Sequence, residues 1–469
     1  MKMDKEKKAA VDGPIYDART LGTPKMLVLG LQHLFAMFGA TVLVTILTGL
    51  NVSVTLLFAG LATLFMHLVT KRKVPVFLGS SFAFLGGYFS VVASGAELGL
   101  SQAESLPYAC VGVACAGLLY LVLSLICKAF GSKNVMRYFP PVVTGPIIIA
   151  IGLILAPSAI NNCSSNWLIA LTAIVVVIVC NIWGKGMMKI VPILMGVLVS
   201  YLLAAVTGNV DFSGVKEAAW IGLPVQMQNT VFGLFGSGKV NSGLLISSII
   251  MIVPIAFATM MEHVGDISAI GGTIERNLIE DPGLHRTLIG DGIGTTIAAL
   301  FGAPANTTYG ENTGVLVLTK VYDPKVVRIA AYFAVVLSFC PKFAALISAM
   351  PAATVGGVSI ILYGMISAVG VRNMVENHTD FQKSRNVIVA AVILGLALGV
   401  NFSGLLGADI TTAGNNAVGA ISFTIGSMRI GLSGLAVASI VGILLNAILP
   451  GKRDEYMPNQ ENSGSLGKF

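Results

Sequence analysis

Charged residues are scarce in this sequence. Asp, Glu, Lys and Arg together supply 11% of the 469 residues, whereas apolar residues supply 55%, and the mean hydropathy is +0.85. This balance excludes a disordered chain and an ordinary soluble domain, because both carry a larger share of charge. The formal net charge of +7 does not indicate a nucleic-acid partner, since the basic residues lie in short stretches beside apolar runs.

Patterns of metal ligands and catalytic nucleophiles are also missing. The six cysteines are scattered, and most lie inside apolar runs, where a cysteine packs as a small apolar residue. No His-Glu-x-x-His pattern occurs, and neighbours such as Glu262 and His263 diverge on a helix. The sequence therefore predicts no metal and no cofactor, and a membrane enzyme is the least favoured class.

Long apolar runs are what the sequence has in abundance. About fourteen of them recur between residues 25 and 449, and most approach the length that crosses the ~30 Å hydrocarbon core of a bilayer. The runs around 76–96 and 305–320 are interrupted by polar residues and glycines. We expect an all-α integral membrane protein of about fourteen transmembrane segments, with short extended pieces in the interrupted third and tenth segments.

Basic residues are distributed unevenly between the connections. Lys71 to Lys73, Lys128 to Arg137 and Arg276 to Arg286 fall in alternate connections, whereas those between them are acidic or nearly neutral. Basic loops stay on the cytoplasmic side of a membrane. We therefore expect a multi-pass protein of the cell membrane with both termini cytoplasmic, and with charged cytoplasmic tails over residues 1–23 and 451–469.

The two interrupted segments share a plan. Residues Val74 to Phe84 form an extended piece with a Gly-Ser break, and Ser80 or Ser81 is a good cap for a helix that starts after it. In the second, polar residues from Asn306 to Asn312 lead into an apolar half-helix. The two are seven segments apart and would run in opposite directions, which predicts an inverted-repeat transporter with its site at the midplane. The alternative is a pair of simple kinks in ordinary spans.

Carboxylates inside the apolar runs are the candidate binding residues. Glu262 and Asp266 are four residues apart and share one helix face, whereas His263 points about 100° away from Glu262. Glu311 belongs to the second interruption. If Glu262 and Glu311 share a cavity, their repulsion favours a proton on one of them in one transport state, which is a route to proton coupling. The alternative for Glu262, His263 and Asp266 is a solvated position near the cytoplasmic interface.

Two other polar side chains lie in apolar runs, and each has two interpretations. His33, which follows Gln32, fits a hydrogen-bonded structural histidine as well as a working one. Tyr363 fits a buried packing residue as well as a partner for a carboxylate.

Four motifs together resemble one known family. They are Gln32-His33 in the first segment, Gly79 to Phe84 in the third, Glu262-His263-x-Gly265-Asp266 in the eighth, and Glu311-Asn312-x-Gly314 followed by Thr319-Lys320 in the tenth. The combination is similar to the nucleobase–ascorbate transporter family, and in particular to its bacterial uracil permease type. The resemblance extends over about 24–450.

The resemblance implies how the segments are arranged. Two inverted repeats of seven segments would form a core domain from residues 24–138 and 242–350, and a gate domain from residues 139–241 and 351–450. A possible homodimer would form through the gate domains.

The resemblance also implies the residues of the site. Glu262 and Glu311 would hydrogen-bond the base, and the backbone amides of Phe82 and Gly310 would donate to its carbonyl oxygens. The remaining positions would be Tyr309 flanking the base, Ala40 close to it, and Asp266, His33 and Tyr363 in proton coupling or support.

These inferences favour a permease that imports uracil by proton symport. The best-known uracil type has His at the position of Asp266, where purine members commonly have Asp, whereas Tyr309-Gly310-Glu311 is similar to the uracil type. A xanthine or other purine permease is therefore the alternative within the family. An ion channel or an anion transporter is the alternative of another class. The expected partners are a nucleobase, protons and the lipid bilayer.

Overall fold

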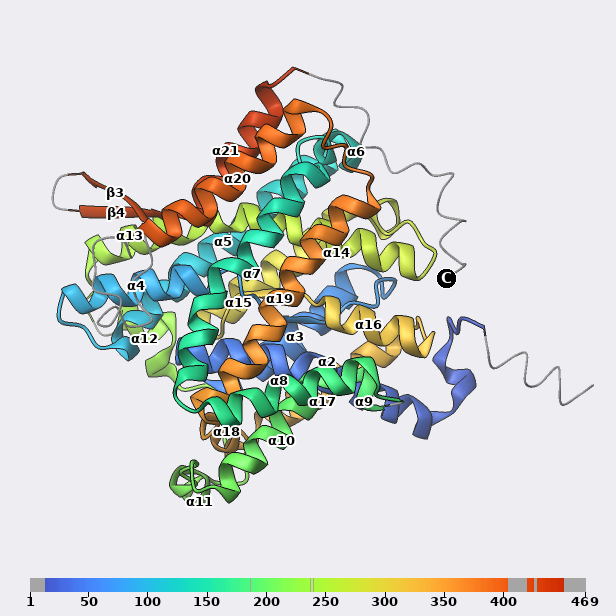
Figure 1. The fold of residues 1–469 in the computed structure, drawn as a ribbon, viewed down its shortest axis with the longest axis vertical. Helices are drawn as coiled ribbons and strands as arrows, with labels where there is room; N and C mark the ends of the chain where they lie inside the picture. Colours follow the sequence, from blue (N-terminus) through green and yellow to red (C-terminus); the bar gives the residue numbers. More distant parts are fainter. Residues whose placement is uncertain are drawn as a thin grey trace, which may run out of the picture.

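The computed structural model describes residues 13–185, 187–236, 238, 240–403, 420–425 and 428–450, and it is mostly helical (Figure 1). Seven helices are long and apolar enough to cross a membrane, or eight if the bent pair α17 (Pro324–Ser338) and α18 (Pro341–Ser348) is one span. The prediction of a helical protein built for a membrane is confirmed. The count of fourteen segments stays a prediction, because the other apolar helices are shorter.

In the described part of the first half, ten helices and one strand precede a long connection. They are η1 (Ala18–Leu21), α2 (Thr23–Thr48), α3 (Val52–Val69), β1 (Leu78–Ser80), α4 (Leu85–Glu97), α5 (Gln102–Phe130), α6 (Ser132–Met136), α7 (Pro141–Ser164), α8 (Trp167–Ile182), α9 (Met187–Ile190) and α10 (Pro192–Val206). A long connection follows, with α11 (Ser213–Glu217), η2 (Met227–Asn229) and α12 (Val231–Gly236).

The second half begins with a long bent helix and again contains a strand before a short helix. Its elements are α13 (Ser242–Ile252), η3 (Val253–Ile255), α14 (Ala256–Thr273), η4 (Ile279–Gly283), α15 (Leu284–Leu300), β2 (Asn306–Thr308), α16 (Gly310–Thr319), α17, α18, α19 (Ala352–Glu376), α20 (Ser384–Ser403), β3 (Ala420–Ile425), β4 (Met428–Ser433) and α21 (Gly434–Ile448).

Local sequence explains where several helices begin and end. Gly49 ends α2 with a left-handed φ of +76°, which glycine adopts without strain, and the Asn51 side chain caps α3 by accepting from the Val54 amide. Ser101 and Glu104 form a reciprocal capping box at the start of α5. Tight turns of this kind reverse the chain, so consecutive helices lie against each other.

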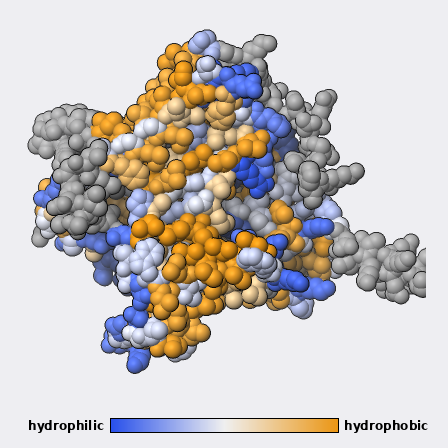
Figure 2. Space-filling model, viewed as in Figure 1, coloured by the Kyte–Doolittle hydropathy of each residue, from blue (hydrophilic) through white to orange (hydrophobic). Residues whose placement is uncertain are grey.

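The helices pack in pairs along their lengths. α7 packs on α19, α5 on α15, α3 on α17, α8 on α10, and α20 on α21. The face shown in Figure 2 carries broad apolar areas. α8 exposes Leu171, Val175 and Ile182. An apolar exterior is stable against lipid chains, which is the solvent that the composition predicts.

The two interrupted segments meet in the interior. β1 and β2 pair antiparallel, with Gly79 opposite Thr307, and all six strand residues are buried. The outer edge of each strand is satisfied by a threonine from a neighbouring helix. The Leu78 amide donates to Thr63 Oγ1 on α3 over 2.9 Å, and the Asn306 amide donates to Thr295 Oγ1 on α15 over 3.2 Å. Backbone groups that leave a helix inside the bundle therefore find partners there.

Three details differ from the sequence predictions. α4 begins at Leu85 and not directly after Ser80 or Ser81, because Ser80 belongs to β1 and the Ser81 amide donates to the Ala305 carbonyl. β3 and β4 pair antiparallel before α21, which the sequence did not predict; residues 404–419 and 426–427 lie outside the described part. Residues 13–22 of the expected N-terminal tail pack against the bundle, while 1–12 and 451–469 are not among the described residues.

Close packing at the strand pair generates a prediction about Gly79. A Cβ atom at this position would lie 2.5 Å from the Tyr309 ring, and that ring is held through its hydroxyl group by Ser80 and Thr41. We expect Gly79→Ala to destabilise the protein by about 1–3 kcal/mol through overpacking, measured as a lower melting temperature in detergent. Gly86→Ala is the control, because a Cβ there meets nothing within 4 Å. Equal melting temperatures for the two variants would contradict the packing described for the strand pair.

Candidate functional site

The start of α16 is a free helix N-terminus beside the strand pair. Tyr309 precedes the helix in an extended conformation and makes no side-chain cap, so the first amides, from Gly310 onward, have no partner from a cap. Gly310 is exposed, and a Cβ atom on it would meet nothing within 4 Å. Glu311 lies in the first turn and is partly exposed. Open N–H donors and a carboxylate therefore lie together here, at the positive end of the helix dipole.

α14 presents a second pair of carboxylates. Glu262 and Asp266 are partly exposed, and Gly265 between them has no neighbour within 4 Å of an added Cβ. Glu262 interacts electrostatically with Asp266, Asp291 and Glu311, and Asp266 interacts with Glu311 and Asp291. The structure thus brings together the carboxylates of α14 and α16 that the sequence singled out, and it adds one from α15.

Asp266 is bound to the strand pair. The Thr308 hydroxyl group on β2 donates to Asp266 Oδ2 over 2.5 Å. A charge-assisted hydrogen bond of this length is strong, and it joins α14 to the residue that lies two positions before α16. Asp266 therefore has a positioning role that its sequence context did not specify.

His263 points away from Glu262, as the helical spacing predicts. Its Nδ1 lies 2.8 Å from Asp291 Oδ2 on α15, and both side chains are fully buried. The Tyr120 ring on α5 contacts the imidazole edge-on, with 6.4 Å between centroids. The solvated position considered for His263 is wrong, because the side chain lies between helices and a buried charge requires such a partner.

His33 supports the start of α16 through Asn312. The Asn312 side-chain amide donates to the His33 carbonyl over 3.1 Å and lies 3.1 Å from His33 Nδ1. Both residues are buried. Of the two interpretations of His33, this arrangement is the hydrogen-bonded structural one, and it ties α2 to the first turn of α16.

Tyr309 and Ala40 are buried residues next to the strand pair and on α2, respectively. The Tyr309 hydroxyl group donates to the Ser80 carbonyl over 2.9 Å and accepts from Thr41 Oγ1 over 3.2 Å. Tyr309 is 3% exposed and Ala40, next to Thr41 on α2, is 1% exposed. Both residues therefore lie in the packing between α2 and the strand pair.

Phe82 and Tyr363 contact each other across two elements. Phe82 lies between β1 and α4, and Tyr363 lies on α19; their rings meet edge-on with 5.7 Å between centroids. Tyr363 is 1% exposed, and its electrostatic neighbours are Ser359 and Ser158. It packs against the interrupted third segment, and no carboxylate is among those neighbours.

Sequence reasoning missed four residues of this arrangement. Asp291 was visible as a carboxylate between two glycines in an apolar run, so the rule that selected Glu262 could have found it. Asn312 belongs to the motif of the tenth segment, but its spacing did not reveal its contact with His33. The sequence assigned no individual role to Thr41 or Thr308, because hydroxyl groups are common in membrane helices and acquire a role only through a partner.

The arrangement suits a neutral polar ligand. Carboxylates on α14 and α16 accept hydrogen bonds from N–H groups, while the amides at the start of α16 donate to carbonyl oxygens. A small molecule that carries both kinds of group could satisfy both sets at once.

Comparison with known proteins gives one consistent family. Residues 24–406 match the model of a permease family. The uracil permease of Bacillus caldolyticus is 39% identical over 93% of this chain and 94% of its own length. The uracil permease of Escherichia coli K12 is 36% identical over 90% of both chains, and a putative pyrimidine permease of the same organism is 36% identical over 92% and 91%.

Solved structures share the fold at low sequence identity. The transmembrane domain of the cyanobacterial bicarbonate transporter BicA has a TM-score of 0.57 at 15% identity, covering 92% of this chain and 99% of its own. SLC26A9 has a TM-score of 0.58 at 12% identity, covering 95% and 69%. The relatives at high coverage are permeases and not enzymes, and the matched range includes every candidate site residue. The chain is therefore a member of the nucleobase–ascorbate transporter family, a family of membrane permeases.

Proposed function

We propose that the protein is a nucleobase permease that imports uracil across the cell membrane by proton symport. The observation that carries the proposal is the meeting of Glu262 and Glu311, from distant parts of the chain, at the free N-terminus of α16. The names of the relatives support uracil as the substrate, since two are uracil permeases at 39% and 36% identity and a third, at 34%, is named a probable uracil permease.

Uracil fits the donors and acceptors of the site. Its ring alternates N–H and C=O groups along one edge, so carboxylates can accept from the former while amides of Gly310 and Phe82 donate to the latter. In this assignment Glu262 and Glu311 bind the base, Ala40 and Tyr309 form the floor, and His33 holds α16 through Asn312.

The proposed transport mechanism uses two inverted repeats of seven segments. Helix contacts support this symmetry, since a pair in one half recurs as a pair seven segments along. α5 contacts α13 as α17 contacts α2, α15 contacts α5 as α3 contacts α17, and α20 contacts α7 as α8 contacts α19. Thr63 and Thr295, which bond the outer edges of β1 and β2, are related in the same way. The domains that the family resemblance implies, a core of residues 24–138 with 242–350 and a gate of residues 139–241 with 351–450, are compatible with that symmetry.

Carboxylates that share a site supply the proposed proton coupling. Glu262, Asp266, Asp291 and Glu311 interact electrostatically, and this concentration of negative charge is costly in a low-dielectric interior. A proton that enters with the base reduces that cost. We assign the proton to Glu262, because the other three carboxylates have partners that favour the ionised form. Asp266 accepts from Thr308, Asp291 lies beside His263, and Glu311 lies at the positive end of the α16 dipole. The basic ends of the bundle, with residues 13–22, would face the cytoplasm.

Two other functions can be distinguished by measurement. A xanthine permease is favoured only by the Asp at position 266, which purine members commonly have. If xanthine competes with the uptake of radiolabelled uracil, the protein is of this type. An anion transporter is favoured only by the fold shared with a bicarbonate transporter, and carboxylates at the site oppose it because they repel anions. Uptake of a panel of bases into proteoliposomes, with and without a pH gradient, tests all of these functions.

Removal of Glu311 tests the assignment of the site. We expect Glu311→Ala to weaken uracil binding about 10- to 100-fold, because a charge-assisted hydrogen bond is lost. Equilibrium binding of radiolabelled uracil to purified protein measures the change. Glu376→Ala is the control, since that carboxylate is exposed and pairs only with Arg372. Near-normal binding by Glu311→Ala would remove the residue from the site.

Neutralising Glu262 tests proton coupling. In wild-type proteoliposomes, an acidic exterior should raise uracil accumulation, because the inward proton gradient drives symport. We expect Glu262→Gln to lose at least about tenfold of this gradient-driven accumulation, since an amide takes up no proton, while uracil exchange at equal pH persists at a reduced rate. Gradient-driven accumulation at the wild-type level would refute the role of Glu262.

A further inference from the structure

Residues 13–22, here called the N-terminal segment, lie across the ends of α14 and α16 (Figure 1). Ile15 forms a parallel bridge with Val321, just beyond α16: its amide donates to the Lys320 carbonyl and its carbonyl accepts from the Tyr322 amide, each over 2.8 Å. This backbone pairing holds the N-terminal segment at the end of α16.

Tyr16 joins the same segment to α14. Its hydroxyl group donates to the carbonyl of Ile274, the residue that ends α14, over 3.1 Å. Its ring contacts Tyr322 edge-on at 5.6 Å, and the Arg276 guanidinium lies 4.9 Å from the ring centroid. The Tyr16 side chain therefore links the chain that follows α14 to the chain that follows α16. It does so through a hydrogen bond, an aromatic pair and a cation–π contact.

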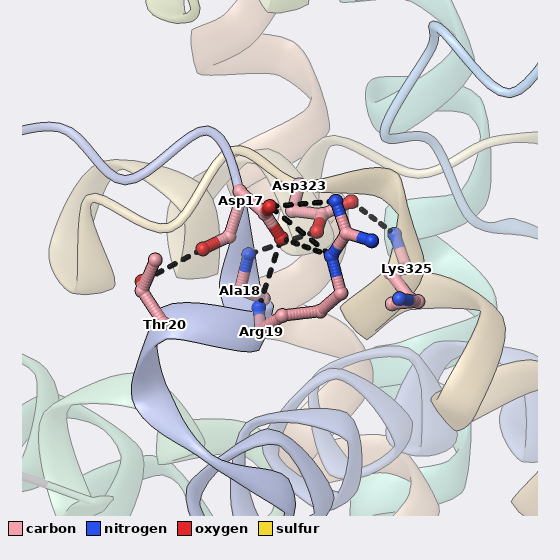
Figure 3. A network of polar contacts seen from close by, with 6 residues as sticks. All are labelled: Asp17, Ala18, Arg19, Thr20, Asp323 and Lys325. Carbon is pink, nitrogen blue, oxygen red and sulfur yellow. Dashed lines mark hydrogen bonds and ion pairs between the residues drawn. The ribbon is translucent and has the colours of Figure 1, made fainter.

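Asp323 anchors the next residues of the segment (Figure 3). Its carboxylate accepts from the Ala18 amide over 2.9 Å and from the Lys325 amide, at the start of α17, over 2.9 Å. Ala18 is fully buried and packs with Val321 and Val326. The segment is thus held by a buried apolar contact as well as by hydrogen bonds.

α14 and α16 share a buried apolar cluster through Ile267, Ile270 and Leu316, and the space beside their glycines near the site is open. Cβ atoms added at Gly265, Gly310 or Gly314 would meet nothing within 4 Å. With a rise of 1.5 Å per residue, Ile274 is about 18 Å from Glu262 along α14, and Val321 is about 15 Å from Glu311 along α16. The two helices are therefore joined at the site by the Thr308–Asp266 hydrogen bond, between the site and their far ends by the apolar cluster around Leu316, and at their far ends by the N-terminal segment.

We propose that the N-terminal segment is a positioning element of the binding site, with Tyr16 as its central residue. By joining the ends of α14 and α16, it fixes the spacing of the helices that carry Glu262 and Glu311. This inference rests on the proposed function only in taking uracil as the ligand for measurement; the connection between the helices exists whichever ligand the site binds.

The Asp17–Arg19 ion pair offers a matched control in the same segment. The two side chains are 45% and 71% exposed and contact each other, not α14. The hydrogen bond from the Arg19 side chain lowers the pKa of the Asp17 carboxyl to about 2. Any stabilisation from this lowered pKa is present above the ordinary value of 3.8 and is lost only as the pH falls towards 2. The pair therefore stays unchanged over the pH range of transport assays.

The test compares Tyr16→Ala, Tyr16→Phe and Arg19→Gln in the full-length protein. We expect Tyr16→Ala to raise the Kd and the KM for uracil about tenfold, a change equivalent to ~1.4 kcal/mol, with the maximal rate per folded transporter within about twofold. Tyr16→Phe keeps both ring contacts and should raise the Kd about threefold, since the bond to Ile274 is lost. Arg19→Gln should match the wild type, because exposed ion pairs contribute little.

Hydrogen–deuterium exchange supplies a readout that needs no ligand. In the wild type, the amides of Ile15, Ala18 and Tyr322 should be protected, and Tyr16→Ala should expose them together with the end of α14. If Tyr16→Ala exposes these amides but leaves the Kd for uracil unchanged, the positioning role is overturned. An N-terminal segment whose amides are unprotected in the wild type would overturn it as well. Wild-type protein that binds no uracil but shows this coupled protection would refute the proposed substrate and leave the connection between the helices standing.

Discussion

The pairing of β1 with β2 inside an apolar bundle is the constraint on which the rest of the structure depends. A chain that leaves the helical conformation away from water must find new partners for its backbone groups, or lose several kcal/mol for each. Here the two interruptions satisfy each other, and Thr63 and Thr295 satisfy the outer edges. Neither interruption would be tolerated alone, so two distant parts of the sequence are obliged to meet.

That meeting creates the site. Once β2 is held by β1, α16 must begin in the interior of the bundle, where its first amides have no helical partner. α14 passes beside the same strand and is fixed to it through Thr308. Side chains from α2 fill the space below, with His33 against Asn312 and Thr41 against Tyr309. Donors and acceptors are therefore held by packed elements and do not depend on the ligand for their positions.

Sequence alone predicted the membrane class and the two interruptions, and it singled out Glu262, Asp266 and Glu311 as candidates, because each of these features is costly in lipid and stands out against an apolar background. Placing α4 at Ser80 or Ser81 failed, since a capping serine and a serine in a strand look the same until the partner strand is known. The pairing of β3 with β4 was missed because glycine, threonine and asparagine also suit an irregular loop. Asp291 could have been selected by the same rule as Glu262, but its pairing with His263 is a property of helix packing that the sequence does not show.

The bond between Thr308 and Asp266 has a chemical property that a lysine or a backbone N–H partner would not give. A hydroxyl group both donates and accepts. When the carboxylate is ionised, the threonine donates to it; when the acid carries a proton, the direction of the bond can reverse and the acid can donate to the threonine oxygen. The anchor between α14 and β2 can therefore outlast a protonation event, so that a change of charge beside the ligand need not loosen the framework that holds it.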